Sequence, residues 1–212
     1  MKHFTLVASL LAIGAVALFV NAHNTDREAS ANGYEIGDQA RDFKLKNVDG
    51  NMVSLSQFDD AKGFIVVFTC NHCPYAKLYE QRIMNLDSMY ASQGYPVIAI
   101  NPNDPTKVEE DSFENMQLRA EEKGYSFPYL VDASQEIAQT YGATKTPHVY
   151  VLQKDGKKLM VRYIGAIDNN HKDAGMATKH FVEDAVDALL AGEEVPESET
   201  KAIGCTIKWK DA

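Results

Sequence analysis

The chain has 212 residues, 45% of them hydrophobic, and a formal net charge of −9. This length suffices for one well-filled core, and the usual size of domains favours one domain over two. The negative charge and the lack of any Lys/Arg cluster argue against nucleic acid and anionic membrane surfaces as partners.

The first 22 residues have the layout of a secretory signal peptide. A weakly charged start precedes an apolar run from Phe4 to Val20, which ends in small residues. We expect cleavage after Ala22; an uncleaved anchor is the alternative, because the run is near the lower length limit for crossing a bilayer. The sequence thus predicts an exported protein, periplasmic or otherwise extracytoplasmic, with a signal peptide at 1–22 and a flexible leader at 23–33.

Strand-like and helix-like segments alternate along residues 34–191, which we interpret as one domain, followed by an acidic linker and tail at 192–212. Asp49-Gly50 between two alternating segments predicts a hairpin, and the β-branched run 63–69 predicts a buried central strand. A helix of about five turns ending at Gly94 follows, then a strand at 96–101, a helix at 113–124 and a strand at 127–132. The last predicted elements are a short helix capped by Ser134, a hairpin turning at Asp155-Gly156 and a helix from about Ala177 to Leu190. This order indicates an α/β fold with a central mixed sheet flanked by helices on both faces.

Two of the three cysteines, Cys70 and Cys73, lie between the predicted central strand and the predicted long helix. At a helix start, free backbone N–H groups and the helix dipole stabilise a thiolate at the first cysteine. The second cysteine lies one turn on, near enough to close a small disulfide ring, and Pro74 suits the first helical turn. Because exported thiols meet oxidants, we predict a redox-active Cys70–Cys73 disulfide in which Cys70 has the lower thiol pKa.

A metal site is the alternative for the same residues. Cys70, His72 and Cys73 can supply ligands, and the fold can bring His148 near them. No second Cys-x-x-Cys or His-x-x-x-His set completes a tetrahedral zinc site, so we expect no metal and no dissociable cofactor. A copper- or zinc-binding chaperone that uses these cysteines and a histidine stays open as the alternative function.

The stretch FTCNHCPYAK at a helix start, with TKTPHVYVLQKDG about 70 residues later, resembles the thioredoxin superfamily. The resemblance is closer to its exported redoxins of the TlpA/ResA and AhpC/TSA-like kind, and it covers roughly residues 34–190. It implies a thioredoxin-like fold with an N-terminal β-hairpin and a redoxin-type strand-and-helix insertion at 102–132. It also implies that Cys70 is the exposed nucleophile, Cys73 the buried resolving thiol, and Thr146–Pro147 a cis bond that faces the disulfide.

The activity that the resemblance implies is that of a thiol–disulfide oxidoreductase. Its partners are protein or small-molecule thiols and disulfides and a redox partner protein, and we expect a monomer. Thr146, in the proline loop, and Asn71 and His72, between the cysteines, form the predicted substrate-binding set. A cation at His72 stabilises the Cys70 thiolate, so we expect a reduction potential above the roughly −270 mV of thioredoxin.

A thiol peroxidase, with an antioxidant role, is the less favoured enzymatic alternative. Its Pro-x-x-x-Thr-x-x-Cys pattern needs Thr and Pro at positions that Val67 and Gly63 occupy before Cys70. Strand 63–69 also lacks the buried acid of thioredoxin proper, so proton transfer to Cys73 must use another group or water.

The third cysteine, Cys205, lies in the closing stretch AIGCTIKWK. Ile203 and Ile207 flank it at two-residue spacing, a pattern that places all three side chains on one face of an extended segment. We therefore expect a tail that docks as a strand, with Cys205 as a buried, unreactive thiol. A second resolving thiol near Cys70 and an intermolecular disulfide are the alternatives.

Overall fold

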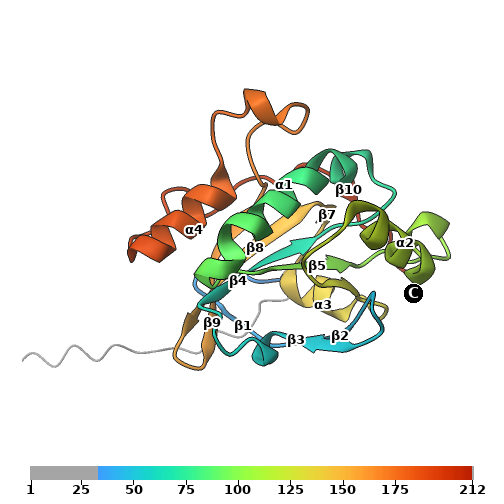
Figure 1. The fold of residues 1–212 in the computed structure, drawn as a ribbon, viewed down its shortest axis with the longest axis horizontal. Coiled ribbons are helices and arrows are strands. Elements are labelled where there is room, and N and C mark those ends of the chain that lie inside the picture. Colours follow the sequence, from blue (N-terminus) through green and yellow to red (C-terminus); the bar gives the residue numbers. More distant parts are fainter. Residues whose placement is uncertain (1–32, 212) are drawn as a thin grey trace, which may run out of the picture.

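The computed structural model describes residues 33–211, and Figure 1 labels elements in this range. The strands are β1 Gln39–Ala40, β2 Lys44–Asn47, β3 Met52–Ser54, β4 Gly63–Phe68, β5 Val97–Asn101, β6 Tyr129–Val131, β7 Lys145–Thr146, β8 His148–Asp155, β9 Lys158–Gly165 and β10 Cys205–Thr206. The helices are α1 Pro74–Tyr90, α2 Phe113–Lys123, α3 Glu136–Tyr141 and α4 Phe181–Ala191, and the 3-10 turns are η1 Leu55–Gln57, η2 Ala91–Gln93, η3 Glu109–Asp111 and η4 Ala174–Met176.

Within residues 33–211, eight strands form one mixed sheet in the order β1-β9-β8-β4-β5-β6-β2-β3, and β10 pairs separately with β7. β4, β5 and β6 are parallel neighbours, while the other pairs in the sheet are antiparallel. Every residue of β4 is buried, as its β-branched and aromatic composition predicts for a central strand. The predicted α/β fold with a mixed sheet is confirmed.

Both predicted hairpins are present. β2 and β3 pair antiparallel around Asp49-Gly50, and Gly50 has a φ of 89°, which glycine adopts without a steric penalty. β8 and β9 pair antiparallel up to Asp155 and Lys158, on either side of the second turn. Turn chemistry in the sequence was therefore sufficient to fix both connections.

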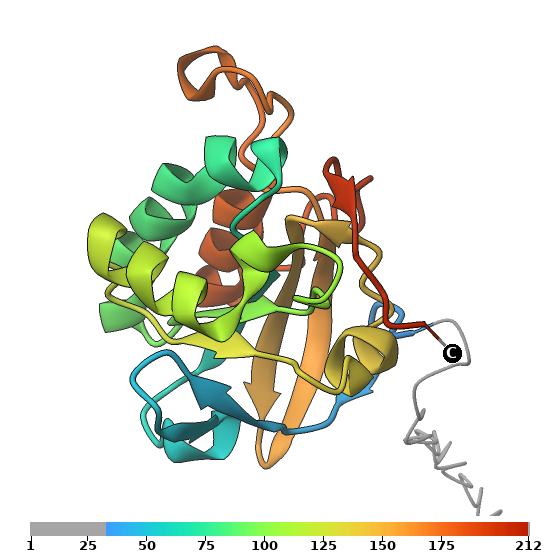
Figure 2. The ribbon, with the colours of Figure 1, turned by 90° about the vertical axis from the view of Figure 1, so that its right-hand side faces the viewer.

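The alternating side chains of β4 point to the two faces of the sheet and join two different cores. Phe64, Val66 and Phe68 pack with α3 and the segment before β2, whereas Ile65 and Val67 pack with α1, α2 and α4. Figure 2 shows α1, α2 and α4 on one side of the sheet, and α3 with the C-terminal segment on the other. Helices cover both faces, as predicted.

The long helix α1 spans 17 residues, with Pro74 in its first turn, and continues through η2 to Gly94. Two apolar residues of α1, Leu78 and Met89, are exposed. Tyr79, Ile83 and Leu86 carry the packing against the sheet, because they share the face that the sheet covers.

Two helix starts differ from the prediction. The N-cap residue of α3 is Gln135 and not Ser134, and the Gln135 side chain makes no capping hydrogen bond. Side chains that precede the helix accept from its first turn: Asp132 Oδ2 accepts the Ala138 N–H at 2.8 Å, and Ser134 Oγ accepts the Glu136 N–H at 3.3 Å. α4 begins at Phe181 instead of about Ala177. Asn169 Oδ1 accepts two backbone N–H groups of residues 178–179 and holds them outside the helix.

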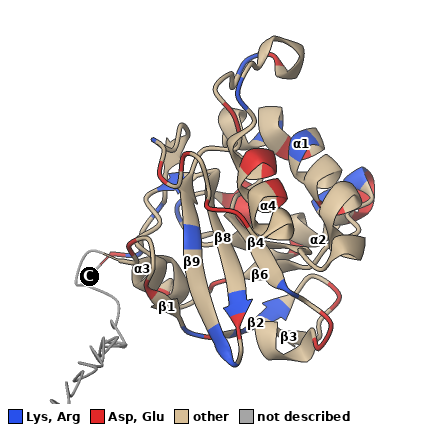
Figure 3. Cartoon of the chain, turned by 90° about the vertical axis from the view of Figure 1, so that its left-hand side faces the viewer, with Lys and Arg blue, Asp and Glu red and all other residues tan. Residues whose placement is uncertain are grey.

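Charges of both signs are scattered over the face shown in Figure 3, and α4 carries acidic side chains. This agrees with the absence of a Lys/Arg cluster in the sequence. Among the described residues no helix is both long and apolar enough to cross a membrane. The predicted signal peptide at 1–22 lies outside the described residues, as does the predicted leader up to residue 32.

Candidate active site

The Cys-x-x-Cys motif lies at the carboxyl end of the central strand β4, where α1 begins. Cys73 is the N-cap residue of α1, and Cys70 lies in the short connection between the two elements. β8 pairs antiparallel with β4, so the Thr146–Pro147 loop that precedes β8 reaches the same end of the sheet. The Thr146–Pro147 bond is cis, which confirms the prediction made from the resemblance.

Thr146 contacts both cysteines of the motif and is fully buried. The Cys70 thiol donates a hydrogen bond to Thr146 Oγ1 at 3.1 Å, and Cys73 Sγ lies 3.2 Å from the Thr146 carbonyl oxygen. The structure therefore brings together four of the predicted site residues: Cys70, Cys73, Thr146 and Pro147.

The disulfide in the structure joins Cys73 to Cys205, with a Cα–Cα distance of 6.0 Å, and leaves Cys70 as a free thiol. It thus differs from the expected Cys70–Cys73 pair, and the expectation that Cys205 is an unreactive thiol is wrong. The tail does dock as a strand, as predicted, but its partner is β7. In this antiparallel pair Cys205 lies opposite Thr146, whose carbonyl contacts Cys73, so Cys205 meets Cys73.

Cys70 is buried, with 3% of its surface exposed, in contrast to the exposed nucleophile that the resemblance implies. Burial raises the pKa of the Cys70 thiol to about 11, and the negative charge of Asp111 adds to the rise. Hydrogen bonds with Thr146, with the Cys73 backbone and with Asn103 oppose the shift without cancelling it. In the form with the Cys73–Cys205 bond, the expected low pKa of Cys70 is therefore not found.

Asp111 is a site residue that the sequence did not reveal. It lies in η3, within the insertion 102–132, and its buried carboxylate accepts from Asn71 N–H at 2.7 Å and from Asn103 Nδ2 at 2.8 Å. His72 Nδ1 lies 2.5 Å from Asp111 Oδ2. The insertion therefore places an acid beside Cys70, whereas the acid that β4 lacks concerns Cys73. The acidic run Glu109–Asp111 in a loop was the available signal, but only the fold brings it to the motif.

The two residues between the cysteines have different surroundings. Asn71 is buried, and its side chain donates to Glu110 O at 2.7 Å and accepts from Tyr129 OH at 2.9 Å. These contacts fix the motif loop against the insertion and β6. The amide group of Asn71 is therefore occupied by hydrogen bonds within the protein. The His72 side chain is 17% exposed and remains the more accessible of the two.

His148 is a buried strand residue at the start of β8, where its Nδ1 accepts from Thr144 N–H at 3.4 Å. Burial lowers the pKa of His148 to about 4, which keeps the ring neutral at pH 7. Among the described residues, the group of side chains close enough to share a metal ion is Cys70, His72 and Asp111, which excludes His148.

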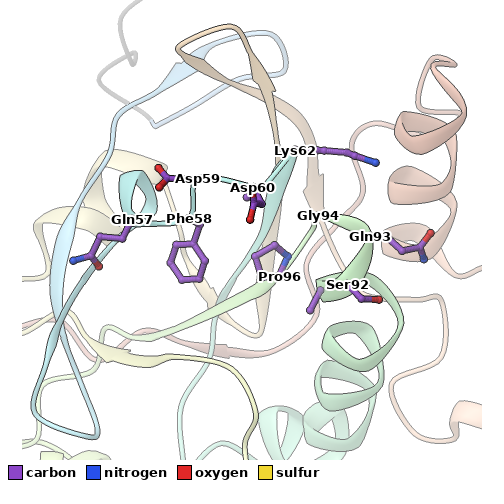
Figure 4. Close-up of a pocket in the computed structure, with 11 residues that line it drawn as sticks. Gln57, Phe58, Asp59, Asp60, Lys62, Ser92, Gln93, Gly94 and Pro96 are labelled. Atoms are coloured by element: carbon purple, nitrogen blue, oxygen red, sulfur yellow. The ribbon is translucent and has the colours of Figure 1, made fainter.

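A hollow of about 500 Å³ lies at the opposite end of β4 from the cysteines. Segments 57–62 and 91–96, which precede β4 and β5, form its wall, and Figure 4 shows that Lys62 and Gln93 extend away from its centre. In parallel sheets, ligands bind outside the carboxyl ends of the strands, and this hollow lies at their amino ends. We therefore assign the chemistry to the cysteine end of the sheet.

Comparisons with known proteins agree with this geometry. Residues 36–163 match the AhpC/TSA family. A thiol-disulfide oxidoreductase ResA from Halalkalibacterium halodurans is 26% identical over 163 residues, which are 76% of this chain and 86% of that protein.

Two solved structures are more similar in sequence, and both proteins are without an assigned activity. An uncharacterized conserved protein from Geobacillus kaustophilus is 40% identical, with a TM-score of 0.78 over 85% of this chain and 95% of that one. A hypothetical protein from Sinorhizobium meliloti 1021 is 33% identical, with a TM-score of 0.78 over 87% and 100% of the two chains.

The thioredoxin domain of a thiol-disulfide oxidoreductase from Bacteroides vulgatus shares the fold, with a TM-score of 0.50, at 18% identity over 63% of this chain and 91% of that one. The family match covers more than half of the chain, and its boundaries enclose the motif and the Thr146–Pro147 loop. The chain belongs to the AhpC/TSA family of thioredoxin-fold redoxins.

Proposed function

We propose that this protein is an exported thiol–disulfide oxidoreductase that exchanges disulfides through Cys70 and Cys73. The ResA relatives carry the name of this general activity, and the chain is an oxidoreductase of the same kind. We assign the exchange reaction to Cys70 and Cys73 because both contact Thr146, at the carboxyl end of β4 and the start of α1.

The exchange proceeds by attack of a thiolate on a sulfur. The Cys70 thiolate attacks a substrate disulfide, one substrate thiol leaves, and a mixed disulfide forms on Cys70. Cys73 then attacks Cys70 Sγ and releases the second substrate thiol. The Asp111–His72 pair lies beside Cys70 and is the group through which a proton can be exchanged with the Cys70 thiol.

Substrates and location follow from the same features. A protein or small-molecule disulfide can approach from the side of the partly exposed His72, while the buried Thr146 positions the two cysteines and Asn71 fixes the motif loop. The apolar segment 4–20 supports export to the periplasm or another extracytoplasmic space, where disulfides form. That the protein acts as a monomer stays a prediction.

A metal-binding chaperone is the second candidate, because ligand atoms of Cys70, His72 and Asp111 lie within 4.8 Å of one another. Its donor set is a poor fit for zinc or copper. His72 Nδ1 and both Asp111 oxygens are already engaged in hydrogen bonds, and Cys73 is bonded to Cys205. Stoichiometric zinc or copper that stays bound through dialysis would favour this candidate over the oxidoreductase.

The test of the oxidoreductase uses reduced full-length protein and oxidised glutathione. We expect Cys70→Ser to release no glutathione, and Cys73→Ser to accumulate a glutathione adduct on Cys70, detected by mass spectrometry. Thr206→Ser, an exposed change in the tail, serves as the control and should behave as wild type. Glutathione release by Cys70→Ser at the wild-type rate would refute the assignment of the nucleophile.

A further inference from the structure

All three cysteines of the chain meet at one place. Cys70, Cys73 and Ala76 form a small buried cluster, and Cys205 packs against it. Cys73 is bonded to Cys205 and shares Thr146 with Cys70, so it is the central member of the group. A cysteine in this position can form a disulfide with either neighbour.

The tail that carries Cys205 is held on both sides of the cysteine. Before it, Thr200 N–H donates to Ile164 O at 2.9 Å, and Thr200 Oγ1 accepts from Ala166 N–H at 3.0 Å. After it, Lys208 N–H donates to Asn103 Oδ1 at 2.8 Å. These contacts do not involve the disulfide, so they can position Cys205 beside Cys73 before any bond forms.

Gly204 makes the close approach of the tail possible. A Cβ atom at this position would overlap the backbone of Thr146 and Pro147, the two residues of the cis bond. Only glycine lets the tail lie this close to the loop, and the residue that follows it is Cys205.

The tail is also linked to the acid–base group of the site. Asn103 accepts from the tail at Lys208 with its carbonyl oxygen and donates to Asp111 with its amide nitrogen at 2.8 Å. Asp111 in turn contacts His72. One side chain therefore joins the docked tail to the surroundings of Cys70.

We propose that Cys205 is a third redox cysteine, which the docked tail delivers to Cys73 to complete a relay that rests on the proposed function. After the exchange has produced a Cys70–Cys73 disulfide, the Cys205 thiolate attacks Cys73 Sγ. The Cys73–Cys205 bond forms as the Cys70–Cys73 bond breaks, and Cys70 takes up the proton that Cys205 lost. Overall, two electrons pass from Cys73 and Cys205 to the substrate disulfide, which leaves as two thiols.

The relay ends in a state that does not readily reverse. Cys70 is buried, and with a pKa of about 11 only about one thiol in ten thousand is ionised at pH 7. Because the thiolate is the attacking species, the return attack of Cys70 on the Cys73–Cys205 bond is slow. Oxidising equivalents are thereby moved from the nucleophile to a bond between the motif and the tail.

The test follows the disulfides of the fully reduced full-length chain after addition of one equivalent of oxidised glutathione. Samples are quenched with acid, alkylated, digested without reduction and analysed by mass spectrometry. We expect disulfides of Cys70 to appear first and to be replaced by Cys73–Cys205, with Cys70 recovered as a thiol. In Cys205→Ser, the Cys70–Cys73 disulfide should be the end product.

Matched glycine variants test the delivery by the tail. Gly204→Ala should slow formation of the Cys73–Cys205 bond by roughly tenfold or more, because the tail can no longer lie against the Thr146–Pro147 loop. Gly175→Ala, at a glycine whose Cβ would meet only one side-chain atom at 3.4 Å, should leave the rate unchanged. An unchanged rate in Gly204→Ala would contradict docking.

The outcomes separate this inference from the proposed function. Glutathione release that ends in Cys70–Cys73 and a free Cys205 would overturn the relay alone. A Cys73–Cys205 bond that appears without an earlier disulfide of Cys70 would overturn it as well. If wild type releases no glutathione at all, both the relay and the proposed exchange reaction are wrong.

Discussion

Cys70 shows how far the surroundings of one residue can change its chemistry. Placement before a helix predicts a stabilised thiolate, yet burial and the Asp111 charge raise the pKa of Cys70 to about 11. In the Cys73–Cys205 form, we expect alkylation of native Cys70 by iodoacetamide to speed up about tenfold per pH unit from pH 7 to 10. The unfolded chain, in which the thiol has an ordinary pKa, is the control. A plateau below pH 9 in the native protein would contradict the buried state of the thiol.

Asp111 gives a second prediction for a single residue. Asp111→Asn removes the negative charge beside Cys70, so the pKa of Cys70 should fall and alkylation at pH 8 should become several-fold faster. Glu110→Gln, which neutralises the exposed neighbour, is the matched control. Equal alkylation rates in the two variants would show that the Asp111 charge has no influence on Cys70.

Strand β8 carries a buried titratable residue that makes stability depend on pH. Burial lowers the pKa of His148 to about 4, below the ordinary value of 6.5, so between these pH values the unfolded chain binds more protons than the native one. Stability is therefore complete above pH 6.5 and is lost as the pH falls towards 4, by about 3 kcal/mol in total. Urea unfolding at pH 7.5, 5.5 and 4.5 measures this loss.

The matching variants identify the source of that loss. His148→Gln keeps an oxygen that can accept the Thr144 N–H and should flatten the pH dependence. His180→Gln, at a half-buried histidine before α4, should keep the wild-type slope. If His148→Gln loses stability as steeply as wild type, the acid sensitivity arises elsewhere.

On the scale of the whole molecule, Gln135 holds the C-terminal tail against the rest of the fold. Gln135 is buried with a φ of 62°, a left-handed conformation that is uncommon for glutamine, and its side chain donates to Lys208 O at 2.9 Å and accepts from Lys210 N–H at 2.8 Å. Gln135→Asn tolerates this backbone but is too short to reach the tail. We expect faster hydrogen exchange at Lys210 and faster alkylation of Cys70 in the reduced protein.

Gln139→Asn is the control for this variant, because Gln139 lies exposed in α3, the helix whose N-cap residue is Gln135. If Gln135→Asn and Gln139→Asn leave Cys70 equally unreactive, the tail does not limit access to the thiol. Slow alkylation of both would then have to come from the motif itself.

Local sequence determined the elements of this protein and the position of its motif. The buried run of β4, the Asp-Gly turns and the amphipathic spacing of α1 each depend on residues close together in the chain, and the structure contains all three. The resemblance carried by the motif and the proline loop added the cis Thr146–Pro147 bond. Short-range patterns suffice for such features because propensity, turn chemistry and periodicity act over a few residues.

Only the tertiary structure decided which residues meet. Cys73 and Cys205 are 132 residues apart in sequence, and Asp111 reaches Cys70 from the insertion 102–132. Periodicity predicted that the tail is extended, but not that it pairs with β7, and the partner of Cys205 depends on that register. Burial then determined the chemistry, because the same Cys70 that is a thiolate candidate at a helix start becomes a protonated thiol when it is buried beside Asp111.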